Sequence, residues 1–402
     1  MLSNLNATKL LLTALLSGVS GFSAVSAEDN NAPTASSADR SVSFWDMAYL
    51  EKAFIDTTPA PRHDAVPVGE LGVDGGDKDM ILKLAQEIAE GKHGLFDSLL
   101  IVQNGKLLFE SYYRRGRVDL PHMQASTTKA YLGLAIGRAI QLGYLTMADL
   151  DKPVVSFLKN LEPEKFAEGV ERITLHHAMT MRSGLRLSRA QQEEFNKKPD
   201  QLKGQGQVQT YFEHTQAITP DTQVFDYKNA DPQLVMQVLD AVVPGTAQDF
   251  IENELLDKMG ITNFDWLQDK SGLPMGPYGS RMTSRNMIKW GMLAKNGGKW
   301  NGEQLIPKAF IVKATNEIIR PSDDEAFFVG NNVSNPGYGY YWWQADMQVD
   351  NISYFTTSAQ GGGGNYIILV EDLDLMVITT AHERDEAMMQ VTADRVLPAF
   401  AQ

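Results

Sequence analysis

Residues 126–143 read STTKAYLGLAIGRAIQLG and predict a helix near the middle of the chain. Gly143 is typical of the residue that ends a helix, because glycine readily adopts the left-handed conformation found there. The apolar side chains recur at the i, i+3, i+4, i+7, i+8 spacing of one buried helix face: Leu132, Ala135, Ile136, Ala139 and Ile140.

The first turn of this helix carries two residues that suit nucleophilic catalysis. Ser126 and Lys129 lie one turn apart on one face. The positive helix N-terminus lowers the cost of a serine alkoxide and disfavours the lysine cation. Ser126 is therefore a candidate nucleophile and Lys129 a candidate base. The alternative is that Ser126 only caps the helix, and the same spacing recurs at Ser156 and Lys159 in a loop-like context.

Strand patterns lie at both ends of the chain, on either side of this helical middle. Residues 98–102 and 106–110 are apolar runs joined by Asn104-Gly105, a dipeptide typical of β-hairpins. Residues 366–370 and 375–379 are two more such runs. We therefore predict an α+β fold, with one antiparallel sheet built from both ends of the chain. N- and C-terminal helices would flank this sheet, and a mainly helical subdomain would be inserted into it.

The boundaries of the lobes follow from this plan. We expect an α/β lobe over about 46–120 and 285–402, and a helical lobe over about 121–284. The flanking helices are predicted near 79–91 and 386–400, and further helices near 232–243, 247–259 and 286–295. The polar stretch 189–216 is an excursion whose role the sequence leaves open.

The N-terminal residues have the pattern of a secretory signal. Lys9 precedes a short apolar run, and small residues lead to Ala27, which predicts a cleaved signal peptide over 1–27. A membrane anchor is the alternative, but Gly18 and Gly21 interrupt the run well short of a bilayer span. Residues 28–45 predict a flexible lead-in to one folded domain over 46–402. The mature chain would be periplasmic or secreted, without a membrane span.

Composition excludes several classes of function. The 402 residues include no cysteine and carry a net charge of −14. The chain therefore has no disulfide, no thiol nucleophile and no Cys-ligated metal. Nucleic acid is not an expected partner, because phosphate binding needs clustered positive charge. His176-His177 lies in an apolar helical stretch and suits packing better than a metal site.

A second candidate motif is Tyr227-Lys228-Asn229. The Tyr227 hydroxyl can share a proton when an ammonium lies nearby. Asn229 offers a donor and an acceptor that could align a substrate amide or the lysine. The alternative is a turn before a helix that Asp231 would cap.

A third motif, Ala359-Gln360-Gly361-Gly362-Gly363-Gly364-Asn365, directly precedes a strand. Glycines there would let another group approach the backbone, and an exposed N–H at a strand edge could stabilise an oxyanion. A bulge or a flexible loop is the alternative. The chain has neither a phosphate-binding P-loop nor the Gly-x-Ser-x-Gly elbow of α/β-hydrolases.

Together, Ser-x-x-Lys, Tyr-x-Asn and the glycine-rich strand edge occur in an order that resembles the serine β-lactamase-like superfamily. The similarity covers roughly residue 95 to the C-terminus. It looks closest to the class C β-lactamase-related serine hydrolases, in the esterase and 6-aminohexanoate-dimer hydrolase branch. Segments 173–185, 279–283 and 296–300 also look like this family.

The resemblance implies a role for each motif residue. Ser126 would be acylated, Lys129 would take its proton, and Tyr227 would share that proton. Asn229 would orient substrate and lysine, while the backbone N–H groups of Ser126 and Gly362 would form the oxyanion hole, with Gly361 ending the third motif. No metal or cofactor would be needed, and the substrate would be a small-molecule ester, amide or peptide.

One departure separates this chain from many members of the superfamily. Ala359-Gln360-Gly361 stands where β-lactamases and penicillin-binding proteins often carry Lys-Thr-Gly or Lys-Ser-Gly. A cation there helps to hold the substrate carboxylate. We therefore expect an esterase or amidase, with a true β-lactamase or D,D-peptidase as the alternative. A non-catalytic periplasmic binding protein with the same fold is a further alternative, and the oligomeric state stays open.

Overall fold

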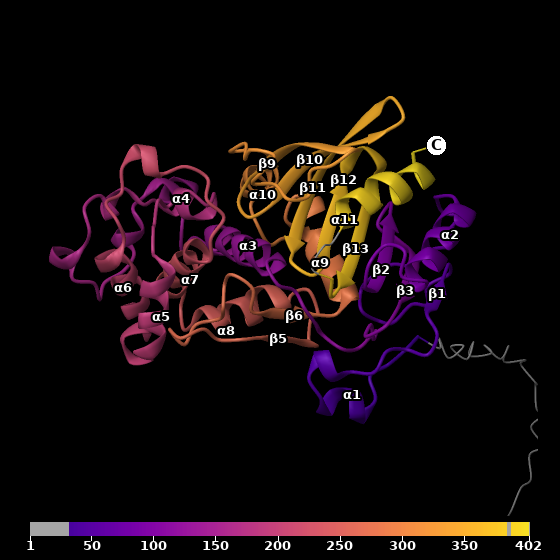
Figure 1. The fold of residues 1–402 in the computed structure, drawn as a ribbon, viewed down its shortest axis with the longest axis horizontal. Coiled ribbons are helices and arrows are strands. Elements are labelled where there is room, and N and C mark those ends of the chain that lie inside the picture. Colours follow the sequence, from indigo (N-terminus) through magenta and orange to yellow (C-terminus); the bar gives the residue numbers. More distant parts are fainter. Residues whose placement is uncertain (1–31, 384–386, 402) are drawn as a thin grey trace, which may run out of the picture. The chain divides into compact units, whose positions relative to one another are not determined.

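The computed structural model describes residues 32–383 and 387–401. Within them an eight-stranded antiparallel sheet has the strand order β1-β3-β2-β13-β12-β11-β10-β9 (Figure 1). The strands of this sheet are β1 (Phe54–Asp56), β2 (Phe96–Gln103), β3 (Lys106–Tyr112), β9 (Val333–Tyr338), β10 (Trp343–Val349), β11 (Ile352–Gly361), β12 (Asn365–Val370) and β13 (Leu375–Ala381). The predicted α+β fold is confirmed.

The two ends of the chain meet where β2 pairs with β13. Leu100 lies opposite Ile378 in this ladder. The β2–β3 turn has positive φ at both Asn104 and Gly105, as the dipeptide predicts. Strands β2 and β13 are buried along nearly their whole length, because helices cover the sheet. The sheet is therefore assembled from segments more than 270 residues apart.

Helices cover both faces of the sheet. Helix α9 (Ser284–Lys295) packs on β13, β12 and β2. On the other face, α2 (Lys78–Ala89) packs against the C-terminal helical segment that includes α11 (Met388–Val391) (Figure 1). We expected one C-terminal helix over 386–400. The segment instead passes through a π-helical turn (Thr392–Val396) and a 3₁₀ turn (Leu397–Ala399), where Pro398 has no backbone N–H to donate. Residue 386 lies outside the described part.

The inserted part is mainly helical, as predicted. Its elements are α3 (Thr127–Gln141), α4 (Leu175–Met179), α5 (Arg189–Lys197), α6 (Gly206–His214), α7 (Ala230–Val242) and α8 (Ala247–Ile251). The polar excursion at 189–216 forms α5 and α6. Helix α3 is buried over nearly its whole length and packs against α7 and β11. It therefore connects the helical part with the sheet.

The short elements hold the ends of longer ones in place. Strands β4 (His122–Met123), β6 (Ser280–Met282) and β5 (Phe264–Trp266) form a three-stranded sheet. Its first strand, β4, directly precedes α3 in the chain. A β7–β8 hairpin (Lys299–Trp300 and Glu303–Gln304) and α10 (Lys308–Thr315) follow α9. No helix within the described residues is long and apolar enough to cross a bilayer.

The N-terminal segment differs from the expected flexible lead-in where it is described. Residues 32–46 include α1 (Ser37–Ser41) and a 3₁₀ turn at Phe44–Asp46. Asp39 forms an ion pair with Arg117, and the Ala35 N–H donates to Asp119 Oδ1 at 2.7 Å. These polar partners, far away in sequence, hold the segment against the folded body. The predicted signal peptide over 1–27 and the first part of the lead-in lie outside the described residues.

Candidate active site

Ser126 stands at the N-terminal end of α3, where β6 and β12 hold the residues on either side of it. The Gln124 N–H donates to Ser280 O at 2.9 Å, and the Thr128 and Ser280 hydroxyls lie 2.8 Å apart. Thr127 Oγ1 donates to Asn365 O at the start of β12. Ala125 has a φ of +46°, an unusual value for a residue with a side chain. The turn that presents Ser126 is thus held from both sides.

The Ser126 side chain is paired with Lys129 and does not cap the helix. Lys129 Nζ donates to Ser126 Oγ at 2.8 Å and to Pro277 O at 2.8 Å. The lysine is only 1% exposed. Burial lowers the pKa of the Lys129 ammonium to about 7. A substantial fraction of this amine is therefore neutral at physiological pH and able to accept a proton.

Tyr227 brings a third polar side chain to the serine–lysine pair. Lys129 Nζ lies 4.9 Å from the centroid of the Tyr227 ring, and the Trp343 ring lies 5.7 Å from it. Burial of the hydroxyl raises the pKa of Tyr227 to about 12, although hydrogen bonding to Ser126 opposes the rise. Tyr227 as a whole is 37% exposed, so its ring borders the opening of the site. The phenol stays protonated at neutral pH.

Asn229 occupies the N-cap of α7, a position that the alternative interpretation of this motif assigned to Asp231. Asp231 lies inside the first turn, where its carboxylate accepts bonds from the N–H and hydroxyl of Ser183. Burial raises the pKa of Asp231 to about 6. In the part of the chain that the structure describes, the Asn229 side chain has no hydrogen-bond partner. Its contact with Lys129 or substrate therefore stays a prediction.

Gly361 and Gly362 lie where β11 ends, beside the start of α3. A Cβ at Gly361 would stand 2.1 Å from Gln124 O, so only glycine allows this approach. A Cβ at Gly362 would meet nothing within 4 Å. Among residues 32–383 and 387–401, neither the Ser126 nor the Gly362 N–H finds a protein acceptor. Both are free to donate to a developing oxyanion.

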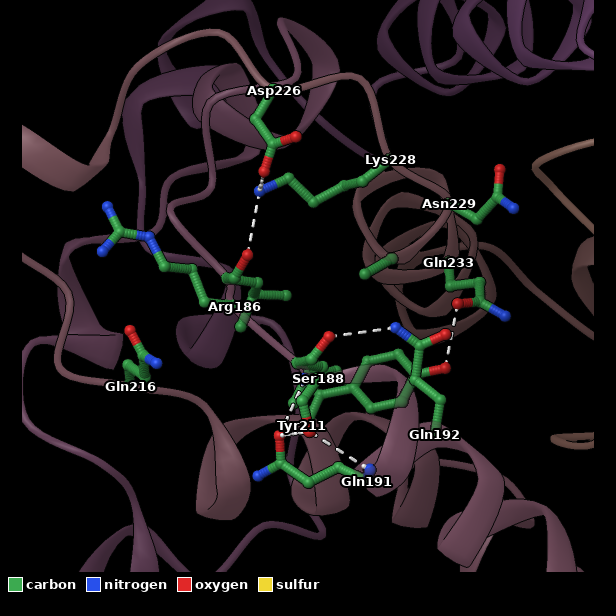
Figure 2. A pocket seen from close by; sticks show the side chains of 13 residues that line it. Arg186, Ser188, Gln191, Gln192, Tyr211, Gln216, Asp226, Lys228, Asn229 and Gln233 are labelled. Carbon is green, nitrogen blue, oxygen red and sulfur yellow. Dashed lines mark hydrogen bonds and ion pairs between the residues drawn. The ribbon is translucent and has the colours of Figure 1, made fainter.

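A polar cavity of about 600 Å³ adjoins the Tyr-x-Asn loop. Figure 2 shows Asp226, Lys228 and Asn229 on one side of it, with Gln191 and Tyr211 across. Lys228 donates to Leu185 O at 2.9 Å and pairs with Asp226 at 2.8 Å. The excursion at 189–216 therefore supplies a wall of this cavity.

The second Ser-x-x-Lys and the His-His pair form hydrogen bonds with nearby residues of the fold. The Ser156 hydroxyl donates to Pro153 O at 2.6 Å and not to Lys159. His176 bonds the Tyr340 hydroxyl at 2.8 Å and Arg182 at 3.0 Å. No group of three or more His, Asp or Glu side chains suited to a metal ion occurs within the described residues. Trp343 belongs to an aromatic run, 338–343, that the sequence assigns to the sheet core or to the wall of a pocket, and it contacts the Tyr227 ring. Sequence reasoning missed Pro277, because a backbone acceptor such as Pro277 O leaves no mark in side-chain patterns.

The fold and site together define a class of protein, in which a serine and a lysine meet at the start of a helix beside an antiparallel sheet. The beta-lactamase family model matches residues 83–400, and the chain belongs to that family. This confirms the resemblance drawn from the sequence motifs.

Individual relatives are distant. An uncharacterized protein of Alkalihalophilus pseudofirmus is 24% identical over 272 residues, which are 62% of this chain and 71% of that protein. A proposed beta-lactamase from Bacteroides dorei has a TM-score of 0.64 and 17% identity, covering 81% of this chain and all (100%) of the other. A proposed 6-aminohexanoate-dimer hydrolase from Bacillus anthracis has a TM-score of 0.59 and 15% identity, covering 86% and 90%. At these identities the solved structures are similar in fold.

Proposed function

We propose that this chain is an exported serine hydrolase that cleaves an ester or amide bond through an acyl-enzyme on Ser126. The observation that carries the proposal is the 2.8 Å contact between Lys129 Nζ and Ser126 Oγ, made by a buried amine whose pKa is lowered to about 7. A nucleophile next to a base that is neutral at working pH meets the requirement for covalent catalysis.

In the first half of the proposed reaction, neutral Lys129 takes the Ser126 proton as Oγ attacks the carbonyl carbon. The carbonyl oxygen becomes an oxyanion and accepts bonds from the N–H groups of Ser126 and Gly362. When the tetrahedral intermediate collapses, the leaving group receives the proton from Lys129, either directly or through the Tyr227 hydroxyl. A tyrosine with a pKa of about 12 can relay a proton in this way without being a phenolate in the resting enzyme.

In the second half, water attacks the acyl group on Ser126. Lys129 takes a proton from that water, and the same two N–H groups stabilise the second oxyanion. Collapse breaks the bond to Oγ and returns a proton to it, which releases the acid. All of these steps use groups of the chain itself, so the proposal needs no metal or cofactor.

The third motif bears on the substrate class. Ala359 is buried in β11 and offers no cation for a substrate carboxylate. This favours an ester or amide whose recognition does not depend on a carboxylate bound at the third motif, over a β-lactam. The proposal of export rests on the signal-peptide pattern of residues 1–27. A mature protein whose N-terminal residue is Glu28, as determined by intact-mass analysis, would support it.

A fluorophosphonate probe and a substrate screen test the proposal. We expect an adduct on the peptide containing Ser126, together with hydrolysis of p-nitrophenyl esters or D-amino-acid amides that Ser126→Ala abolishes. Ser156→Ala is the matched control, because that residue belongs to the second Ser-x-x-Lys, and it should change neither result. Activity that survives in Ser126→Ala would refute the mechanism. Nitrocefin hydrolysis faster than that of any ester or amide would favour the β-lactamase alternative, and ligand binding without turnover would favour a binding protein.

A further inference from the structure

A second cavity, of about 360 Å³, lies directly beside the proposed oxyanion hole. We call it the Trp45 cavity. It is lined by residues from four separate parts of the chain: Phe44, Trp45, His122, Met123, Ala125, Gly362, Gly363, Asn365, Ala381, His382 and Glu383. Ala125 immediately precedes the nucleophile, and Gly362 carries an oxyanion donor. A substrate whose carbonyl is held there must therefore place one of its flanking groups near this cavity.

Aromatic rings line much of the wall. The Phe44 ring meets the His122 ring at 4.6 Å and 75°, and the His382 ring at 5.8 Å and 77°. The Trp45 ring meets His382 at 6.2 Å and 81°. These are edge-to-face arrangements, which leave ring surface for a further flat group.

The two histidines contribute ring surface because their nitrogen atoms are already in use. His122 Nε2 and His382 Nδ1 both bond Asp97 Oδ2, at 3.0 and 2.7 Å. His122 Nδ1 bonds Met123 O, and His382 Nε2 bonds the Tyr49 hydroxyl, each at 3.0 Å. These four bonds point every ring nitrogen at another group of the chain and fix the orientation of both rings. The wall is thus suited to apolar contact.

Arg115 holds the aromatic segment in position. Its guanidinium donates to Trp45 O at 2.9 Å and to Met47 O at 3.3 Å, and lies 4.9 Å from the Tyr49 ring. Trp45 is nevertheless 59% exposed. A fixed backbone with an exposed indole beside a cavity is the arrangement expected of a binding surface.

The Trp45 cavity is open where Gly362 lines it. A Cβ on Gly362 would meet no atom within 4 Å, so the space next to this lining residue of the cavity is open. Cavities of this size bury small ligands mainly through apolar contact.

We propose that the substrate bears an apolar, ring-sized group next to its scissile carbonyl and that this group binds in the Trp45 cavity. The inference deepens the proposed hydrolase function and rests on it, because the position of the carbonyl follows from Ser126 and Gly362. The group can belong to the acyl part or to the leaving part of the substrate, and the experiment distinguishes the two.

Two pairs of esters test the proposal. p-Nitrophenyl phenylacetate and p-nitrophenyl acetate differ in the acyl part, whereas benzyl acetate and ethyl acetate differ in the leaving part. We expect the wild type to prefer the ring-bearing member of one pair by roughly 10-fold or more in kcat/KM. Trp45→Ala should remove that preference and leave the rate with the small ester nearly unchanged. Phe327→Ala is the matched control, since Phe327 is equally exposed (60%) and lies outside the cavity wall.

In a wild type that hydrolyses these esters, no preference in either pair, or a preference that survives Trp45→Ala, would overturn the inference. A binding measurement separates this failure from failure of the hydrolase proposal. Phenylacetamide binding to Ser126→Ala, followed by ligand-observed NMR, should be lost on adding Trp45→Ala and kept on adding Phe327→Ala. Such binding in a protein whose wild type hydrolyses nothing would support the cavity and reject the hydrolase. Binding that does not depend on Trp45 would reject the cavity.

Discussion

At the scale of single residues, the protonation state of Lys129 controls the proposed chemistry. Desolvation is the cause of its lowered pKa, and within the described residues its partners are the Ser126 hydroxyl and Pro277 O rather than a carboxylate. Tyr227 is shifted in the opposite sense, because burial disfavours the charged form of each group. The site therefore keeps an amine that can lose its proton next to a phenol that holds one.

This arrangement predicts how activity depends on pH. Lys129 acts as a base only when neutral, and folding lowers its pKa from 10.5 to about 7. We therefore expect kcat/KM to rise with pH through about 7 and to level off above it. A pH profile from 5 to 9 measures this, and a kcat/KM that still rises in proportion to hydroxide at pH 9 would contradict it.

Replacing the base gives a companion test at the same position. Lys129→Arg keeps the charge but cannot deprotonate, so acylation should fall by roughly 10²-fold or more. Lys159→Arg, in the second Ser-x-x-Lys, is the matched control and should retain activity. Equal rates for the two variants would exclude Lys129 as the base.

At the scale of elements, the site depends on how closely the end of β11 approaches the start of α3. No side chain fits between them at Gly361, whereas the space at Gly362 is open. Strand β6 holds the other side of the same turn through Ser280. The distance between the N–H groups of Ser126 and Gly362, the oxyanion donors that we propose, is thus set by the packing of a strand against a helix.

Gly361→Ala should separate these two elements. Its Cβ would fall 2.1 Å from Gln124 O and 2.9 Å from Thr127 Oγ1, so β11 must shift away from Ser126. We expect a loss of kcat of roughly 10²-fold, comparable with removal of one oxyanion donor. Gly362→Ala keeps its N–H and meets no atom, so its loss should be much smaller. The reverse order of the two losses would contradict this account.

At the scale of the whole described body, a buried ion pair joins segments that are far apart in sequence. Arg285 of α9 donates to both carboxylate oxygens of Glu110 on β3, at 2.9 and 2.6 Å, and to Asp64 at 3.1 Å. Glu110 is fully buried and also accepts from the Tyr112 hydroxyl. Burial by itself would lower the pKa of Arg285, but the Glu110 carboxylate beside it holds this pKa above its usual range. This pair fixes α9 on the sheet.

Arg285→Met should therefore cost about 3–5 kcal/mol in the free energy of unfolding, because it leaves a buried carboxylate without its partner. Lys165→Met is the control, since it breaks only an exposed, solvent-screened pair with Glu162 and should leave the free energy of unfolding nearly unchanged. Urea denaturation of the three proteins measures both values. Similar losses of unfolding free energy for the two variants would show that the buried ion pair stabilises the fold no more than the exposed one.

Features that depend on neighbouring residues could be predicted from the sequence, whereas features that depend on contacts between distant segments could not. The Asn104-Gly105 hairpin and the apolar stripe of α3 were predictable because turn chemistry and helix spacing are local. Strands β4, β5 and β6 have two or three residues each, and their partners lie far away in the chain, so no local pattern marks them. Ser126, Lys129 and Tyr227 could be named from motifs. The Pro277 acceptor and the Phe44–Trp45 wall could not, because they depend on tertiary contacts.

The pairing of β2 with β13 also has a consequence in time. A nascent chain that has reached residue 300 already contains Ser126, Lys129 and Tyr227. It still lacks β11, which carries Gly361 and Gly362, and β13, the neighbour of β2. The centre of the sheet and the approach of Gly361 to the start of α3 therefore form only after β11 and β13 have been synthesised. Such long-range closure is slow, so the surroundings of Ser126 are completed late in folding.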